Sequence, residues 1–372
     1  MLPSGATTLI SPLAPSDALP SSFPLLEPSI VGSLPKPAWL AQPNVLRAPW
    51  RLAGGELREA QDDAVRLALL DQEEAGLGVV CDGEIRRRHY IWGFLDGLTG
   101  TDTERLTKKR ARGGRYSELT EVARLTGPVR RESPIFVDAC RFARAHTSKP
   151  LKVTLPGPMT VADSVADEAG DADFKTLAMR FAEMLNREAR DLVDAGADVV
   201  QFDEPCFNIY LDEVTAWGIE TLEQAMDGVR ARKAVHICYG YGTPTVLAWK
   251  SANTDWGHYG VTLPLLARSG VDQVSVECAA SGVDVAVLGE LRGKDVLLGV
   301  VDVGTEDVET PDVVADRIRR ALPYVAPERL KPCTDCGLVP RSRAAALGKM
   351  RALAEGAALV AREVAGARAA GR

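Results

Sequence analysis

Four residues of types that bind zinc stand out in the second half of this 372-residue chain. His236 and Cys238 alternate in the segment AVHICYG, Glu277 lies in QVSVECA, and Cys336 lies in CTDCGL. The apolar run before His236 predicts a strand, and residues two apart on a strand point to the same side. One imidazole, two thiolates and one carboxylate make a plausible tetrahedral zinc site. Zinc with soft, negatively charged ligands suits the activation of a thiol substrate.

The same residues allow plainer interpretations. Cys333 and Cys336 form a CxxC pair, which with His236 and Cys238 would make a structural zinc site and leave Glu277 outside it. Cys238 taken alone fits a buried small side chain. Glu277 taken alone fits the partner of a basic residue. The spacing leaves these alternatives open.

The elements that must position these residues are short apolar runs, most of them separated by helical patterns. The predicted strands are Ser29–Ser33, Gly78–Asp82, Pro150–Leu155, Asp198–Asp203, Ala234–Cys238, Gln273–Glu277, Asp295–Asp302 and Leu330–Asp335. The predicted helices are Glu56–Ala75, Phe174–Ala195, one opened by Thr310-Pro311-Asp312, and a last one from about Ser342 to Val364. Gly76 and Gly196 end the first two helices. Eight strands alternating with helices predict a (β/α)8 TIM barrel, with an open doubly wound sheet as the alternative.

Polar residues stand at nearly every predicted strand end, where such barrels carry their chemistry. Besides the four candidate ligands, these residues are Val31-Gly32-Ser33, Asp82-Gly83-Glu84, Asp203-Glu204-Pro205, Asp302 and Asp335-Cys336-Gly337. So uniform a ring indicates one site at the barrel mouth.

Residues 1–27 form a Pro/Ser-rich lead that we expect to be mobile, and 28–372 are predicted to form a single barrel. An excursion over about 85–148, after the second strand, breaks the alternation and contains the basic Lys108–Arg115 stretch. A run of charged residues such as this one usually forms a solvent-exposed surface without a binding role. The sharper hypothesis is that the excursion folds over the mouth and meets an anionic substrate tail or an acidic partner.

Composition limits the classes of function. The chain is 46% hydrophobic and 26% charged, with a formal net charge of -7, which gives no support for nucleic-acid binding. Seven scattered cysteines are typical of a reducing compartment rather than of a disulfide framework. The lead lacks a positively charged start followed by a continuous apolar core, so it does not predict a secretory signal. No apolar run is long enough to cross a bilayer. We therefore expect a cytoplasmic protein with no membrane partner.

Taken together and in order, several segments resemble the catalytic barrel of cobalamin-independent methionine synthases. These are VGSLP, DGE, LPGPMT, QFDEP, HICYG, SVEC, GVVDV, ETPDVV and CTDCGL, spread from about Val31 to Arg362. The second, N-terminal barrel of the double-barrel members has no counterpart in this sequence, so the chain resembles the short, single-barrel branch.

This resemblance implies zinc bound by His236, Cys238, Glu277 and Cys336, and homocysteine as the thiol substrate. It implies that Val31, Gly32 and Ser33 hold the amino-acid portion of homocysteine. It also implies that Glu84 and Asp203 take the ammonium group, which suits a pair of carboxylates. The methyl donor it implies first is 5-methyltetrahydrofolate.

The donor side departs from the family pattern. After GVVDV, the double-barrel enzymes have a histidine thought to protonate the folate leaving group, and this chain has Gly304 there. Trp92, Trp217 and Trp256 are candidate stacking residues for the donor. A methyl-corrinoid or a methyl-supplying partner protein are alternative donors, and coenzyme M is an alternative thiol. From a different class, the chain could be a non-catalytic zinc-binding barrel.

Overall fold

A computed structural model describes residues 25–43, 45–168, 170 and 172–370. Its centre is a curled parallel sheet of seven strands in the order β1-β4-β6-β7-β8-β9-β10. The strands are β1 Val80–Cys81, β4 Leu151–Pro156, β6 Val199–Asp203, β7 Arg232–Ile237, β8 Gln273–Val276, β9 Asp295–Val301 and β10 Leu330–Thr334. Each strand pairs in parallel with the next one of this sheet along the chain, as in a TIM-type barrel. The predicted fold class is confirmed.

The predicted first strand, Ser29–Ser33, is the one that the structure does not form as a strand. The segment bridges the two edges of the sheet, because Ser29 N donates to Pro332 O in β10 and Gly78 N, just before β1, donates to Pro28 O. Side chains take its other backbone groups: Lys152 Nζ and Gln201 Nε2 donate to the carbonyls of Ile30 and Val31. A regular ladder therefore cannot form, although the segment closes the barrel.

The predicted helices form with small shifts at their ends. They are α1 Gly54–Glu74, α5 Phe174–Asp194, α10 Pro311–Ala321 and α11 Arg343–Ala370. Gly76 and Gly196 follow α1 and α5 with φ of +90° and +104°, the left-handed conformation that glycine adopts at little cost. Thr310 Oγ1 accepts from Val313 N as the N-cap of α10. The other helices are α2 Trp92–Leu95, α3 Val137–Arg144, α4 Pro158–Asp163, α6 Leu211–Glu213, α7 Ile219–Met226, α8 Pro244–Ala252 and α9 His258–Arg268.

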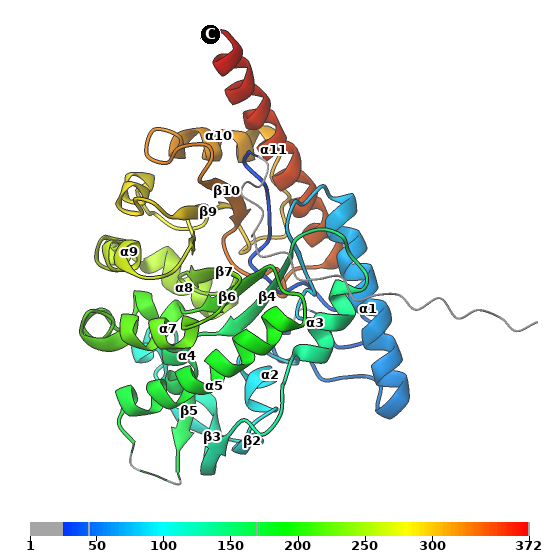
Figure 1. Cartoon of the computed structure of the whole chain (residues 1–372), viewed down its shortest axis with the longest axis vertical. Coiled ribbons are helices and arrows are strands. Elements are labelled where there is room, and N and C mark those ends of the chain that lie inside the picture. Colours follow the sequence, from blue (N-terminus) through cyan, green and yellow to red (C-terminus); the bar gives the residue numbers. More distant parts are fainter. Residues whose placement is uncertain (1–24, 44, 169, 171, 371–372) are drawn as a thin grey trace, which may run out of the picture.

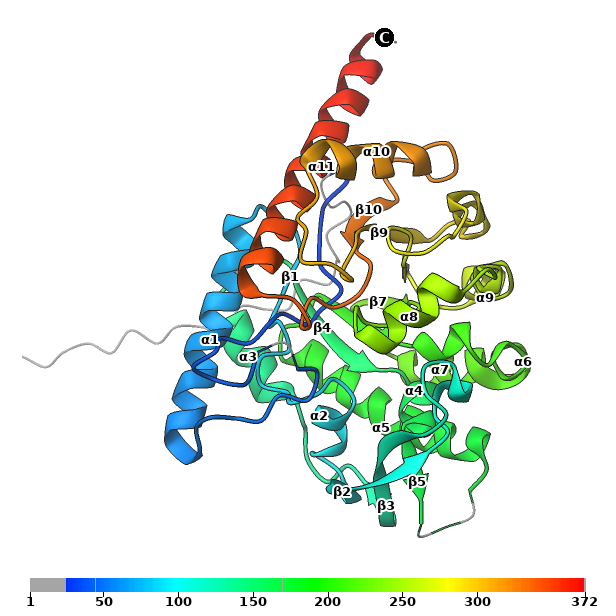
Figure 2. The same cartoon turned by 180° about the vertical axis from the view of Figure 1, so that it is seen from behind.

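The excursion over about 85–148 supplies a hairpin of two long strands, β2 Thr99–Lys109 and β3 Thr120–Arg130. β3 also pairs with β5, Val165–Asp167, to give a separate three-stranded sheet. This sheet lies at one end of the molecule, and α11 projects at the other end (Figure 2). The hairpin tip, residues 110–119, thus reaches the barrel from a sheet of its own.

In the part of the chain that the structure describes, every helix is too short or too polar to cross a membrane. Residues 1–24 of the predicted mobile lead lie outside the described residues.

Candidate active site

A cavity of about 440 Å³ opens at the carboxyl ends of the barrel strands. Residues from separate strand ends meet in it: Val31, Ser33, Glu84, Asp203, His236, Cys238 and Cys336. The parallel register explains part of this, because Asp203 of β6 lies beside His236 of β7, and His236 beside Ser275 of β8. Most of the predicted ring of strand-end residues is therefore one site.

His236, Cys238 and Cys336 form the potential metal-binding group of this cavity. Their ligand atoms all lie within 4.8 Å of one another, and all three residues are buried. His236 Nδ1 lies 2.8 Å from Ser275 Oγ, whereas its Nε2 is buried without a hydrogen-bond partner. An imidazole fixed through one nitrogen and bare at the other is the usual state of a metal-binding histidine.

The two thiols fit a shared metal ion. Cys238 Sγ and Cys336 Sγ are 3.7 Å apart and form no disulfide. Two sulfurs bound to one tetrahedral zinc at about 2.3 Å each would be about 3.8 Å apart. The hydrogen bond from Cys336 and the nearby His236 hold the pKa of Cys238 well below its usual range, despite burial. The same thiolate raises the pKa of Cys336 well above its usual range.

Glu277 lies next to this group but is not one of its members. Its Oε1 is 2.6 Å from Lys250 Nζ, and its Oε2 accepts a hydrogen bond of 3.0 Å from Tyr239 N. Burial raises the pKa of Glu277 to about 8, with Lys250 acting in the opposite direction. Cys333 is also absent from the metal-binding group; it packs with Val31 and Leu297, and Ser29 Oγ donates to its sulfur. A structural zinc site that includes Cys333 therefore has no support among the described residues.

Glu84 lines the cavity and is held in place by its neighbours. Its Oε1 accepts from Thr154 Oγ1 at 2.8 Å, and Thr154 Oγ1 in turn accepts from Arg87 Nη1. Its backbone has a φ of +55°, and Asp82 Oδ1 accepts its N–H. A Cβ on Gly32 would come within 2.8 Å of Glu84 Oε1, so glycine is needed for this close approach.

Asp203 is buried and lines the same cavity. Burial raises its pKa to about 7, while His236 lowers it and Glu84 raises it further. Gln201 Nε2 donates one hydrogen bond to Asp203 Oδ1 and another to the backbone carbonyl of Val31. Ser33 Oγ is 3.4 Å from Tyr241 Oη and would be 1.9 Å from a Cβ at Gly337. Two carboxyl groups and a hydroxyl thus face one small volume beside the thiols.

Other acidic residues at the strand ends accept hydrogen bonds from backbone N–H groups. Glu204 accepts from Met159 N and Thr160 N at the start of α4. Asp335 accepts from three successive N–H groups, those of Cys278, Ala279 and Ala280. Asp302 accepts from Gly304 N. These residues shape the loops of the mouth.

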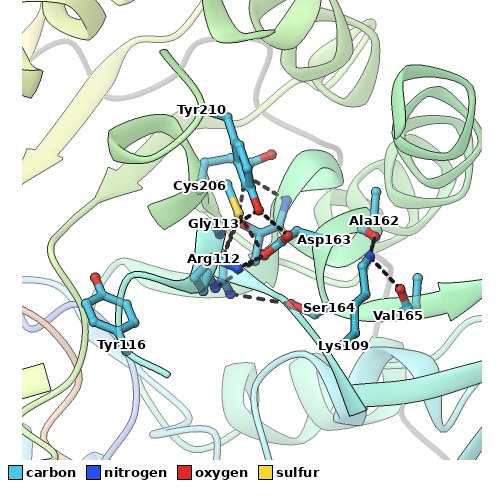
Figure 3. A network of polar contacts seen from close by, with 12 residues as sticks. Lys109, Arg112, Gly113, Tyr116, Ala162, Asp163, Ser164, Val165, Cys206 and Tyr210 are labelled. Atoms are coloured by element: carbon cyan, nitrogen blue, oxygen red, sulfur yellow. Dashed lines mark hydrogen bonds and ion pairs between the residues drawn. The ribbon is translucent and has the colours of Figure 1, made fainter. Parts of the chain in front are cut away.

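The basic Lys108–Arg115 stretch reaches the mouth of the barrel, where Ala111 and Arg112 line the cavity. Arg112 N donates to Asp163 Oδ2, and Arg112 Nη2 donates to Tyr90 Oη and Ser164 Oγ. Figure 3 shows Arg112 close to Asp163, Ser164 and Cys206. Tyr210 Oη donates to Asp163 Oδ1 and accepts from Gly113 N. Lys109 Nζ donates to the carbonyls of Ala162 and Val165.

The lining of the cavity includes the aromatic residues Tyr90, Trp92 and Tyr116. Of the candidate stacking residues, Trp92 lines the cavity, whereas Trp217 packs against Phe174 and Trp256 against Tyr239. Sequence reasoning did not find Thr154, Ser275, Tyr241 or Lys250. Of these, Ser275 stands on a strand two positions from a predicted site residue, Glu277, which is the one signal that could have found it.

Comparison with known proteins agrees with this geometry. Residues 27–358 match the family model described as the catalytic domain of cobalamin-independent synthase. A methionine synthase from Sulfurisphaera tokodaii is 30% identical over 92% of this chain and 94% of its own length. One from Saccharolobus solfataricus is 31% identical over 92% and 97%. A solved B12-independent methionine synthase from Shewanella sp. W3-18-1, in complex with selenomethionine, superposes with a TM-score of 0.89 at 42% identity, over 92% of this chain and 99% of that one. The chain therefore belongs to the cobalamin-independent methionine synthase family, and it is a methyltransferase that acts on homocysteine.

Proposed function

We propose that the chain transfers a methyl group to the thiol of homocysteine at a zinc ion held by His236, Cys238 and Cys336, with 5-methyltetrahydrofolate as the leading donor. The observation that carries this proposal is the pairing, in one cavity, of a bare buried His236 Nε2 and two thiols with a pair of carboxyl groups. When bound, zinc would keep a substrate sulfur ionised at neutral pH, and thiolate ligands would leave that sulfur electron-rich.

The protein residues orient the amino acid. Glu84 and Asp203 would receive the ammonium group, and Ser33 with the backbone of Val31 and Gly32 would hold the carboxylate end. Burial of Asp203 favours this, because a cationic ligand restores the charge that burial opposes. Coenzyme M has no ammonium group, so the two carboxyl groups favour homocysteine over that thiol.

The aromatic residues of the cavity favour a donor with a ring system. Tyr90, Trp92 and Tyr116 are among its lining residues, and aromatic side chains suit contact with a ring such as that of a folate. Gly304 supplies no side chain, and a Cβ there would lie 2.7 Å from Leu247 Cδ2. The proton for the leaving group must therefore come from another group or from the donor's surroundings. The proposal assigns no protein general acid.

Single-turnover methyl transfer tests this function. Zinc-loaded protein receives homocysteine and methyl-labelled 5-methyltetrahydrofolate, and methionine is quantified by mass, with Cys336→Ser as the control. Labelled methionine from the unmodified protein alone supports both metal and donor. No product, with homocysteine still bound at the metal, would reject the folate and leave a methyl-corrinoid or a partner protein as donor. Failure of homocysteine to alter the metal's coordination would reject the thiol-activation step and favour a non-catalytic zinc-binding barrel.

A further inference from the structure

Two hydroxyl groups in the cavity are only weakly engaged by the protein itself. Ser33 Oγ and Tyr241 Oη are 3.4 Å apart, and both residues line the cavity. This contact is clearly longer than a typical hydrogen bond of about 2.7 Å between hydroxyl groups. Among the described residues, it is the only hydrogen bond that either hydroxyl makes. Both O–H groups can therefore turn toward an acceptor on a bound ligand without losing a strong bond.

The position of Tyr241 is fixed before any ligand binds. Its backbone carbonyl accepts a hydrogen bond of 2.8 Å from Thr243 N. Its ring meets that of Tyr90 edge to face, with 5.8 Å between the ring centroids. A Cβ on Gly337 would lie 2.8 Å from Tyr241 Cε1, so this glycine lies directly against the ring. A side chain held in this way loses little freedom when its hydroxyl receives a ligand.

The charges in the cavity leave a need for neutral donors. Glu84 and Asp203 also line it, and carboxyl groups suit an ammonium group but not the carboxylate of an amino acid. The guanidinium groups among the lining residues are those of Arg47 and Arg112, and both already donate to oxygen atoms of the protein. A substrate carboxylate in this cavity therefore depends on uncharged donors such as hydroxyl and backbone N–H groups.

We propose that Tyr241 is a substrate-binding residue whose hydroxyl, together with that of Ser33, donates to the carboxylate of the amino-acid substrate. This inference rests on the proposed function, which places an amino acid in the cavity but gives its carboxylate end to Ser33 and the neighbouring backbone alone. With Glu84 and Asp203 on the ammonium group, the cavity recognises both charged ends of the substrate. A ligand that lacks the carboxylate leaves the paired hydroxyls without an acceptor and is selected against.

Isothermal titration calorimetry of zinc-loaded protein with two ligands tests this assignment. Methionine carries both charged groups, whereas 3-(methylthio)propylamine has the same thioether and ammonium group but no carboxylate. The unmodified protein should bind methionine at least about tenfold more tightly than the amine. Tyr241→Phe removes the hydroxyl and keeps the ring. It should weaken methionine binding by about tenfold and change binding of the amine by less than about twofold.

Tyr116→Phe is the matched control, because Tyr116 also lines the cavity but its hydroxyl donates to the backbone carbonyl of Tyr239 at 2.6 Å. Any disturbance in this variant should change the affinities for the two ligands by the same factor. The inference is overturned if Tyr241→Phe weakens both ligands equally or weakens neither.

If circular dichroism shows that Tyr241→Phe does not fold, Ser33→Ala takes its place. Loss of that hydroxyl should also weaken binding of methionine and not of the amine, and an equal effect on both ligands would overturn the shared contact with the carboxylate. Failure of methionine to bind the unmodified protein would instead reject the proposed function, which places the amino acid in this cavity. The two failures are therefore distinguishable.

Discussion

Binding of the amino-acid product should depend on pH through Asp203. Burial raises the pKa of this carboxyl group to about 7, well above its ordinary value of 3.8. The group is therefore neutral below about pH 7 and becomes a carboxylate above it. Because only the carboxylate attracts an ammonium group strongly, affinity should rise with pH across this value and fall as the solution is acidified.

The size of the effect follows from the fraction of Asp203 that is ionised. For a pKa of about 7, that fraction is about 0.9 at pH 8 and about 0.09 at pH 6, so the affinity should fall about tenfold, or about 1.4 kcal/mol. Methionine is the suitable ligand for isothermal titration calorimetry of zinc-loaded protein, because it has no thiol whose ionisation would add its own pH dependence.

Asp203→Asn is the control, since it retains Glu84 and the shape of the pocket but cannot ionise. Its affinity for methionine should match that of the unmodified protein at pH 6 within a few-fold and should stay flat up to pH 8. Equal affinities of the unmodified protein at pH 6 and pH 8 would falsify the reasoning. So would an Asp203→Asn variant that keeps the full tenfold dependence, because another group would then be titrating.

Three further outcomes follow from the contacts of single residues. Ser275→Ala removes the hydroxyl that lies 2.8 Å from His236 Nδ1 and should weaken zinc affinity by about 10- to 100-fold in a chelator competition, with the fold intact by circular dichroism. Gly32→Ala places a Cβ 2.8 Å from both Glu84 Oε1 and Thr154 Cγ2, and should weaken methionine binding in calorimetry by about 1–3 kcal/mol while zinc affinity is retained. Arg112→Met leaves the buried Asp163 without its cation and should lower the free energy of unfolding in urea by about 3–5 kcal/mol, with faster hydrogen exchange at the hairpin tip. No loss of stability in that variant would show that the tip is not anchored by this pair.

The sequence predicted the barrel because its strands and helix ends carry local signals. Strands β6 and β8 are buried along their whole length, and β9 carries the continuous apolar run VLLGVV that is typical of a buried parallel strand. Thr310 and Gly196 mark helix ends through chemistry confined to a few neighbouring residues. The Ser29–Ser33 segment has the same apolar character but no ladder, since Lys152 and Gln201 occupy its carbonyls. No local sequence pattern predicts the hydrogen bonds from Lys152 and Gln201 to this distant segment.

The site was predictable where it depends on strand ends and not where it depends on side chains that arrive from elsewhere. His236, Cys238 and Cys336 converge because the carboxyl ends of parallel strands meet at one mouth. Lys250 comes from α8, and no periodicity in that helix shows that its ammonium group reaches Glu277. The sequence left open whether Glu277 is a metal ligand or an ion-pair partner, and it gave no sign of the contact of 2.6 Å between Glu277 Oε1 and Lys250 Nζ.

The part of the cavity around the thiols and the part under the hairpin tip are held in place by different kinds of contact. This difference affects how a methyl donor could enter. The thiol half is held by strands and by bonds such as those of Ser275 and Gln201. The other half, where we propose that the donor binds, is completed by the hairpin tip, whose attachment depends on Arg112, Asp163 and Tyr210 (Figure 3). Arg112 has a φ of +55° and is followed by two glycines that also have positive φ, so the tip keeps this shape only while those contacts hold. Entry of a bulky donor would most readily occur by release of this tip, because displacing any strand end would also disturb the thiols.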